Sequence, residues 1–247
     1  MPLKAYWWPA KNFGDTLTPI IVEHFLDEKV EFAKRNDEGK LVGVGSIMVA
    51  MRRNDVIWGT GTNRDWPLKA PAGACFLAVR GPLTRDRVKR AVIPEIYGDP
   101  AILLPLIYKP EIKKTHTFGL IPHYVDKPAA QKMLKDLGEE KNVKMIDIQA
   151  DWKKVIEETL ACDCIVATSL HGLIVAEAYG IPAVWLKLGD KIRGAHLKFN
   201  DYLLGTGRKP EKACLDYRNI HNIPPIQNLA DRQEKLINAL KTWRKSM

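Results

Sequence analysis

The sequence lacks any apolar run of about 18 residues, so it predicts no membrane-spanning helix. The first residues also lack the long apolar core of a secretory signal peptide, and we therefore expect the protein in the cytoplasm. Cysteine is scarce, with four residues in all. Only Cys162 and Cys164 are close together, and their CxC spacing is not that of a zinc finger. The cysteines are therefore expected to be reduced thiols without a ligand role.

Signals for cofactor, metal and nucleic-acid binding are also missing. The glycine-containing run 58–61 is not a GxGxxG fingerprint, and no cluster of residues has metal-ligand spacing, so we expect no cofactor and no metal. Lysine and arginine outnumber aspartate and glutamate by 38 to 29, giving a formal net charge of +9. Because the positive residues are scattered, nucleic acid is not an expected partner. Small anionic substrates and an anionic membrane surface remain compatible with the charge.

Short apolar runs rich in β-formers alternate with amphipathic runs along the 247 residues. The runs that predict strands are 3–8, 41–48, 55–61, 74–81, 115–125, 143–148, 163–169 and 181–188. The runs that predict helices are 18–28, 83–91, 129–140, 151–162, 173–179 and 229–245. Residues 97–105 are expected to form a strand or a buried loop.

This alternation predicts an α/β fold. Continuous apolar strands between helices are typical of a parallel sheet buried on both faces. A polar, basic segment at 108–116, broken by Pro110, resembles a linker. We therefore expect two Rossmann-like domains with a central cleft, at residues 1–108 and 109–225, followed by an amphipathic C-terminal helix at 226–247. Ligands in such folds bind beyond the carboxyl ends of the strands.

Two segments in the first half follow predicted strands and carry candidate binding residues. Asn12 and Asp15 belong to NFGD, which suits either a turn that caps a helix or part of a site. Arg80 ends a buried strand in VRGPLTRD. An arginine there needs an anionic partner, which is either a ligand phosphate or carboxylate or a structural aspartate such as Asp99.

A third segment, ATSLHGLIVAEAYGIP, places His171 in the expected turn between a buried strand and a helix. Gly172 opens that helix, whose free N–H groups form a natural anion site. A histidine at this place can donate a hydrogen bond to phosphate or act as a general acid.

Six motifs in a fixed order carry a resemblance to a known family. They are NFGD, VRGPLTRD, YGDPAILLP, GLIPHYVD, SLHGLIVAEAYGIPAVW and LKFNDYL, between about Asn12 and Leu203. In this order the sequence resembles the polysaccharide pyruvyl transferase family, particularly its bacterial exopolysaccharide branch. The predicted final helix lies outside the resemblance.

The resemblance implies a fold similar to GT-B glycosyltransferases, with phosphoenolpyruvate bound between two domains. It makes Arg80 and His171 the leading residues for binding and activating this donor. It also implies that His123 faces the cleft and that Lys198 adds positive charge. Many family members have arginine where this sequence has Ser169, so one anion contact is either missing here or supplied by Arg193 or Lys198.

The implied reaction attaches pyruvate to a saccharide or lipid-linked oligosaccharide, with phosphoenolpyruvate as a substrate. Because such acceptors are usually lipid-linked in this family, we expect a peripheral contact of the basic C-terminal helix with the inner face of the cytoplasmic membrane. Two alternatives remain open from the sequence. One is a GT-B-like glycosyltransferase that uses a nucleotide sugar, and the other is an inactive saccharide-binding homologue.

Overall fold

The computed structural model describes residues 2–10, 12–216 and 225–247 of the chain. The predicted α/β class is confirmed: the described strand pairings are parallel, and helices lie between the strands. The larger sheet has the order β2-β1-β3-β4-β6. Its strands are β1 (Leu3–Tyr6), β2 (Val30–Phe32), β3 (Leu41–Val42), β4 (Val56–Trp58) and β6 (Cys75–Ala78).

The second sheet has the order β11-β10-β8-β9 and is formed by the second half of the chain. Its strands are β8 (His116–Ile121), β9 (Val143–Met145), β10 (Cys162–Ala167) and β11 (Ala183–Trp185). A small ladder joins β5 (Leu68–Lys69) to β7 (Val88–Lys89). Residues 108–115, where the sequence predicts a linker, form no helix or strand before β8.

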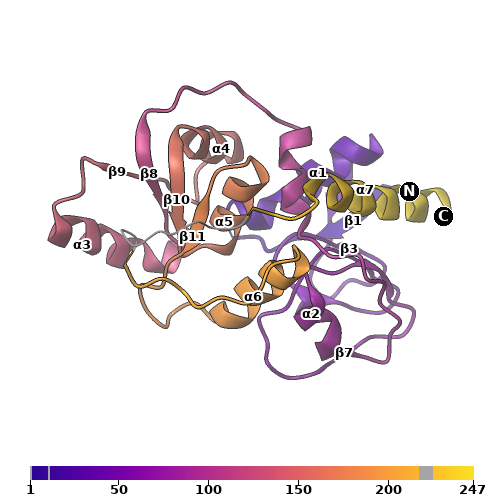
Figure 1. Cartoon of the computed structure of the whole chain (residues 1–247). Helices are drawn as coiled ribbons and strands as arrows, with labels where there is room; N and C mark the ends of the chain where they lie inside the picture. Colours follow the sequence, from indigo (N-terminus) through magenta and orange to yellow (C-terminus); the bar gives the residue numbers. More distant parts are fainter. Residues whose placement is uncertain (1, 11, 217–224) are drawn as a thin grey trace.

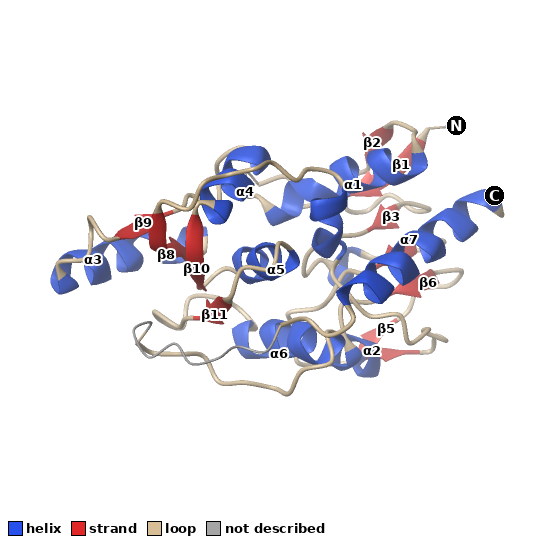
Figure 2. Cartoon of the chain, turned by 45° about the horizontal axis from the view of Figure 1, so that its top comes forward, coloured by secondary structure: helices blue, strands red, loops and turns tan. Residues whose placement is uncertain are grey.

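Helices flank and connect the two sheets. The α-helices are α1 (Leu17–Leu26), α2 (Pro82–Arg87), α3 (Lys127–Leu137), α4 (Trp152–Leu160), α5 (Leu170–Ala178), α6 (Ala195–Gly205) and α7 (Leu229–Lys245). Short 3-10 helices are η1 (Gly14–Thr16), η2 (Met48–Ala50), η3 (Pro100–Leu106) and η4 (Tyr124–Asp126). Helix α5 lies between the two sheets in both views (Figures 1 and 2) and packs against η3.

One apolar cluster runs through both halves of the molecule. It contains Leu3 and Ala5 of β1 together with Ile165 and Ala167 of β10, joined through η3 and α5. Burial of a Val, Leu, Ile or Phe side chain contributes about 1.5–3 kcal/mol each. The shared cluster therefore connects the two sheets through α5 and η3. The domain boundaries at 108/109 and 225/226 stay predictions.

The predicted C-terminal helix is confirmed, and it returns to the first sheet. Its apolar side chains Leu236 and Leu240 are fully buried against β6, η3 and α1. The indole N–H of Trp58 donates to Leu236 O at 2.9 Å, and Gln233 Nε2 donates to Ile102 O at 2.7 Å. Figure 1 shows α7 beside the N-terminal half, with both chain ends on that side.

Three predicted elements differ from the structure. The strand expected at 41–48 ends at Val42, because Gly45 has a positive φ of 104° that turns the chain away. The helix expected at 83–91 ends at Arg87, where Val88–Lys89 leaves to pair with β5. The strand or loop expected at 97–105 contains the buried 3-10 helix η3, which Asp99 caps by accepting from Ala101 N.

Helix α6 is a further difference, because no helix is predicted there from the sequence. Seven of its side chains, polar ones included, are buried, and they lie on all sides of the helix. Periodicity reveals a helix only when one face is polar, so a helix buried all round carries no such pattern. Within the described residues, no helix combines the length and apolar composition needed to cross a bilayer.

Candidate functional site

A cavity of about 530 Å³ lies where the carboxyl ends of strands from both sheets meet. We call it the central cavity. Its walls come from the segments after β1, β3, β4, β8 and β10 and from α6. The lining residues are Tyr6, Trp8, Asn12, Asp15, Arg35, Ser46, Ile47, Val49, Ala50, Asn63, Arg64, His123, Tyr124, Ser169, Leu170, His171, Arg193 and Lys198.

The structure brings most of the predicted site residues to this cavity. Those that line it are Asn12, Asp15, His123, Ser169, His171, Arg193 and Lys198. Those that do not line it are Arg80, Asp99 and Gly172, all of which are buried. The structure therefore brings seven predicted residues, from four separate segments of the sequence, around one space, as expected for the carboxyl ends of parallel strands.

His171 lies inside the first turn of α5, not in the turn before it as the sequence predicted. Its imidazole packs flat against the backbone of Gly14: a Cβ at that glycine would lie 1.8 Å from His171 Nδ1. Its Nε2 faces Asp99 Oδ2 at 3.5 Å, and neither atom has a hydrogen-bond partner in the described chain. Asp99 is thus placed to orient the ring and to stabilise positive charge on it.

The N-terminus of α5 opens at the cavity. Ser169, the N-cap residue, makes no side-chain capping bond, and all nine residues of α5 are buried. The N–H groups of the first helical turn have no intrahelical acceptor, and the helix dipole adds partial positive charge there. Gly172 contributes only backbone, since a Cβ would lie 2.8 Å from Ile121 Cγ2. This end of the cavity suits an anion.

Asp15 and Asn12 line the cavity near His171, in and just before η1. Asn12 Nδ2 donates to Asp15 Oδ2 at 2.6 Å. Burial raises the pKa of the Asp15 carboxyl, while His171 and Asn12 act in the opposite direction. A Cβ at Gly45 would lie 3.4 Å from Asp15 Oδ1 and 3.8 Å from His171 Cε1, so these two side chains converge.

Two further groups at the cavity have shifted proton affinities. Burial, aided by Arg80, lowers the pKa of Lys198 to about 8. Lys198 is only 8% exposed, and its ammonium group makes no hydrogen bond or ion pair with the described residues. Burial, Lys198 and His171 lower the pKa of His123 to about 4, so its ring is neutral at neutral pH. Because His123 Nδ1 accepts from Val125 N at 3.3 Å, the ring proton lies on Nε2.

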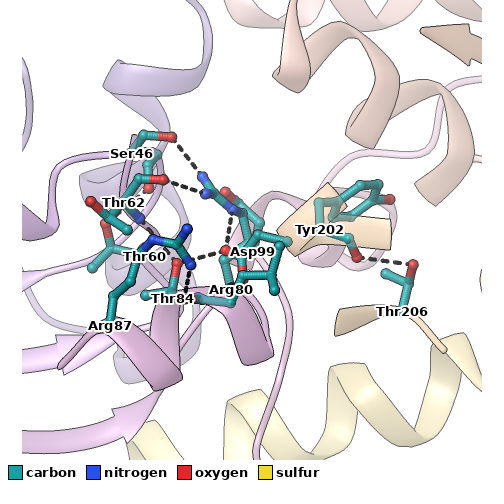
Figure 3. A network of polar contacts seen from close by, with 12 residues as sticks. Ser46, Thr60, Thr62, Arg80, Thr84, Arg87, Asp99, Tyr202 and Thr206 are labelled. Carbon is teal, nitrogen blue, oxygen red and sulfur yellow. Dashed lines mark hydrogen bonds and ion pairs between the residues drawn. The ribbon is translucent and has the colours of Figure 1, made fainter. Parts of the chain in front are cut away.

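Arg80 is fully buried, and Figure 3 shows its side chain within a network of polar contacts. Its Nε donates to Asp201 Oδ2 at 3.0 Å, its Nη2 to Thr62 O at 3.0 Å and its Nη1 to Ser46 Oγ at 2.6 Å. The aspartate partner is therefore Asp201 of α6, in place of the Asp99 suggested by the sequence. Direct binding of a ligand by Arg80 stays a prediction, and the geometry connects Arg80 to the cavity only through Ser46.

Sequence reasoning missed several lining residues. The polar ones are Tyr6, Arg35, Ser46, Asn63, Arg64 and Tyr124. Ser46 and Arg64 follow β3 and β4, so the rule that ligands bind after strands could have found them. Arg35 follows β2, a short strand that is not predicted from the sequence, so the same rule could not locate it.

The charges of the cavity favour an anionic ligand. Arg35, Arg64, Arg193 and Lys198 line it, against a single carboxylate from Asp15. The guanidinium groups of Arg64 and Arg193 lie 4.9 and 5.9 Å from the ring centre of Trp66. Among the residues that the structure describes, no group of three His, Cys, Asp or Glu side chains could hold a metal ion.

Comparison with known proteins identifies the class of this chain. The family model described as "Polysaccharide pyruvyl transferase" matches residues 47–189 of the chain. The match covers more than half of the 247 residues, so the chain belongs to the polysaccharide pyruvyl transferase family. The resemblance drawn from the sequence motifs is thereby confirmed.

The chain is also similar to two known proteins along most of its length. The chain is 33% identical to an uncharacterized protein of Acanthamoeba polyphaga mimivirus, over 94% of this chain and 88% of that protein. It is 26% identical to the succinoglycan biosynthesis protein ExoV of Rhizobium meliloti (strain 1021), over 87% of this chain and 69% of ExoV.

Proposed function

We propose that this protein transfers the pyruvyl group of phosphoenolpyruvate to a sugar, forming a cyclic ketal. The observation that carries the proposal is the central cavity, where His171 and the N-terminus of α5 lie beside Lys198 and Arg193. Phosphoenolpyruvate carries a phosphate and a carboxylate, and both need positive charge or N–H donors. Family membership supplies the class of reaction.

The proposed reaction transfers three carbons and releases phosphate. A proton adds to the methylene carbon of phosphoenolpyruvate, which leaves a cationic centre at the carbon bearing phosphate. One sugar hydroxyl attacks this carbon and loses its proton, and the C–O bond to phosphate then breaks. A second hydroxyl of the same sugar attacks, loses its proton and closes the ketal. Two protons leave the hydroxyls and one enters the new methyl group, so one proton departs with inorganic phosphate.

The residues of the cavity suit these steps. Lys198, Arg193 and the first turn of α5 would hold the donor's anionic groups. His171, oriented by Asp99, would deliver the proton to the methylene carbon, because a histidine moves protons near neutral pH. His123, neutral at this pH, would donate a hydrogen bond through Nε2 and is the second candidate for proton transfer. Asp15 would accept a proton from a sugar hydroxyl.

The finer expectations about fold and location form part of the same proposal. We propose a GT-B-like arrangement in which each sheet belongs to one Rossmann-like domain, with the donor between them. We also propose a cytoplasmic enzyme whose acceptor is a saccharide or its lipid-linked precursor. Since the apolar face of α7 packs on the first sheet, a peripheral contact with the inner membrane face would use its exposed basic side chains.

A phosphate-release assay with phosphoenolpyruvate and candidate saccharides tests the proposal, with mass spectrometry to detect the added pyruvyl group. Thermal unfolding gives a second readout. A ligand at 100 times its dissociation constant stabilises the folded state by about 2.7 kcal/mol. We expect phosphoenolpyruvate to raise the melting temperature more than nucleotide sugars do. A shift with a nucleotide sugar and none with phosphoenolpyruvate would favour a glycosyltransferase, and binding without turnover would favour an inactive homologue.

A further inference from the structure

A second cavity, of about 550 Å³, lies at the carboxyl end of β11. We call it the lateral cavity. The side chains that matter here are Asp65, Trp185, Lys187, Asp190, His196 and Lys212, which line its floor and rim. None of them has a part in the donor chemistry proposed above.

The lateral cavity is a neighbour of the central cavity, because two loops contribute to both. Arg64 lines the central cavity and the next residue, Asp65, lines the lateral one. In the second loop, Arg193 lines the central cavity and the next residue, Gly194, lines the lateral one. The two loops touch at Gly194, whose φ is +60° and where a Cβ would lie 2.3 Å from Asn63 O. The two cavities are therefore separated by the backbone of these two loops.

The charges of the two cavities differ. The central cavity has four cationic side chains against one carboxylate, and it suits an anion. In the lateral cavity Asp65 and Asp190 balance Lys187 and Lys212, and Lys187 Nζ lies 2.7 Å from Asp190 Oδ1. A balanced set of donors and acceptors suits an uncharged ligand with many hydroxyl groups.

Trp185 lies at the floor of this cavity. Its side chain is only 8% exposed and its ring stacks on Phe199, with centroids 4.4 Å apart and an angle of 7° between the planes. The described residues offer no acceptor to its indole N–H. A buried indole usually has a hydrogen-bond partner, as Trp58 has in Leu236 O. An aromatic floor with a free donor, below a polar rim, is typical of a site for a small polar ligand.

We propose that the lateral cavity binds a sugar unit of a neutral oligosaccharide acceptor, next to the unit that reacts in the central cavity. Trp66 is 52% exposed, and its ring contacts Arg64 and Arg193, which belong to the two loops shared by the cavities. The acceptor would pass across this ring from one cavity to the other. This inference rests on the proposed function, which places the reacting sugar unit in the central cavity. Binding of a saccharide to the lateral cavity can be measured without turnover.

The first test uses the indole N–H resonances of the ¹⁵N-labelled protein, with that of Trp185 assigned by loss in Trp185→Phe. The probes are cellotetraose, a galactose-terminated tetrasaccharide, phosphoenolpyruvate and inorganic phosphate. We expect a tetrasaccharide to shift the Trp185 resonance, and the anions to leave it in place. The resonance of Trp58, already bonded to Leu236 O, is the internal control. Failure of both tetrasaccharides to shift Trp185, or a shift caused by the anions instead, overturns the inference.

The second test separates acceptor binding from donor binding. Trp185→Phe keeps the stacked ring but removes the donor, and Asp190→Asn removes an exposed charge at the rim. Each should raise the KM for an oligosaccharide acceptor about two- to tenfold, the scale of one lost neutral hydrogen bond, and leave the KM for phosphoenolpyruvate unchanged. Asp163→Asn, at an exposed aspartate that lines neither cavity, is the matched control.

The two proposals fail in different ways. If phosphoenolpyruvate is consumed but neither Trp185→Phe nor Asp190→Asn changes the KM for the acceptor, the lateral site is overturned and the proposed function stands. If saccharide shifts Trp185 but phosphoenolpyruvate is never consumed, the lateral site is supported and the proposed function fails.

Discussion

Arg80 and Asp201, 121 positions apart in the sequence, form an ion pair with both side chains fully buried. The same carboxylate accepts from Thr84 N at 2.8 Å and from Thr84 Oγ1 at 2.6 Å, which ties α6 to α2. Removing one partner of such a buried pair typically costs about 3–5 kcal/mol. On its outer side the guanidinium donates to Ser46 Oγ, so it orders a hydroxyl at the central cavity (Figure 3).

A double-mutant cycle tests whether Arg80 acts through Ser46. Ser46→Ala and Arg80→Lys should each raise the KM for phosphoenolpyruvate, by about two- to tenfold for one lost hydrogen bond. Lysine keeps the charge but cannot reach Asp201, Thr62 and Ser46 together. If Arg80 acts through the hydroxyl, the double variant should be no worse than Arg80→Lys alone. Additive losses would show that Arg80 contacts the donor itself, and Ser46→Thr should retain most of the affinity.

His171→Ala should lower kcat by about 100-fold or more, the scale of losing acid–base help, while the protein stays folded. The ring contacts Gly14 and lies 3.5 Å from Asp99, and neither residue belongs to a strand. We therefore expect the strand pairings to remain when the ring is removed. Turnover at saturating substrates and far-ultraviolet circular dichroism are the measurements. A folded variant with near-normal kcat would end the assignment and make His123 the next candidate.

Gly14→Ala displaces the same ring without removing a functional group. Its Cβ would lie 1.8 Å from His171 Nδ1, closer than any non-bonded contact, so the imidazole has to move. We expect kcat to fall by at least about tenfold, since proton transfer depends on a positioned group. Normal kcat would mean that the orientation of His171 seen here is not needed for turnover.

Parallel α/β architecture could be predicted because it depends on local patterns, as α7 shows. The predicted helix 229–245 has the observed bounds, since its apolar spacing and polar face are both visible in the sequence. The end of strand β3 and the presence of helix α6 could not be found in this way. Their structure depends on the turn at Gly45 and on burial of all sides of α6 by distant segments.

The site was predictable to the extent that functional side chains follow strands. His123 and His171 follow β8 and β10, and the structure places both at the central cavity. The partner of Arg80 was not predictable, because Asp201 comes from the helix α6 that the sequence did not reveal. Pairing between distant polar residues is a tertiary property that periodicity does not encode.

His123 should make the protein less stable in acid. Its pKa is about 4 in the folded protein and about 6.5 when exposed, so the unfolded chain binds one more proton between these values. Stability from this residue is therefore present above pH 6.5 and is lost as the pH falls toward 4. In urea unfolding at pH 7 and pH 4.5, His123→Gln should lose less stability than the wild type does. Equal losses would show that His123 is solvated in solution.

Binding to anionic vesicles should depend on the exposed basic side chains of α7. Lys241 and Lys245 are exposed, whereas Arg244 is bonded by two contacts of 2.7 Å to Glu28. Attraction to anionic lipid amounts to about 1 kcal/mol per lysine near the surface and falls with salt. In low-salt sedimentation we expect binding to phosphatidylglycerol vesicles, less binding by Lys241→Gln/Lys245→Gln, and none to neutral vesicles. Equal recovery in the supernatant with both lipids would contradict the membrane contact.

Lys198 should set the alkaline limit of donor binding. Its ammonium group is buried at the central cavity, and its pKa is about 8, so it loses its charge as the pH rises above that value. A neutral amine no longer attracts phosphate or carboxylate, and the apparent affinity for phosphoenolpyruvate should fall above pH 8. Lys198→Arg keeps its charge at every pH used, so this decline should disappear. An unchanged decline in kcat/KM for phosphoenolpyruvate would assign the alkaline limb to another group.

Stability gives an independent check on the same lysine. Between pH 8 and 10.5 the unfolded chain holds the proton that the folded chain has released, so the contribution of Lys198 to stability rises with pH in that window. Below pH 8 the buried charge opposes folding in full. Lys198→Met, similar in length and uncharged, should therefore be more stable than the wild type at pH 7, and the difference should shrink toward pH 10.5. A variant that is less stable at pH 7 would show that the ammonium group has a favourable partner, and the low pKa would then be wrong.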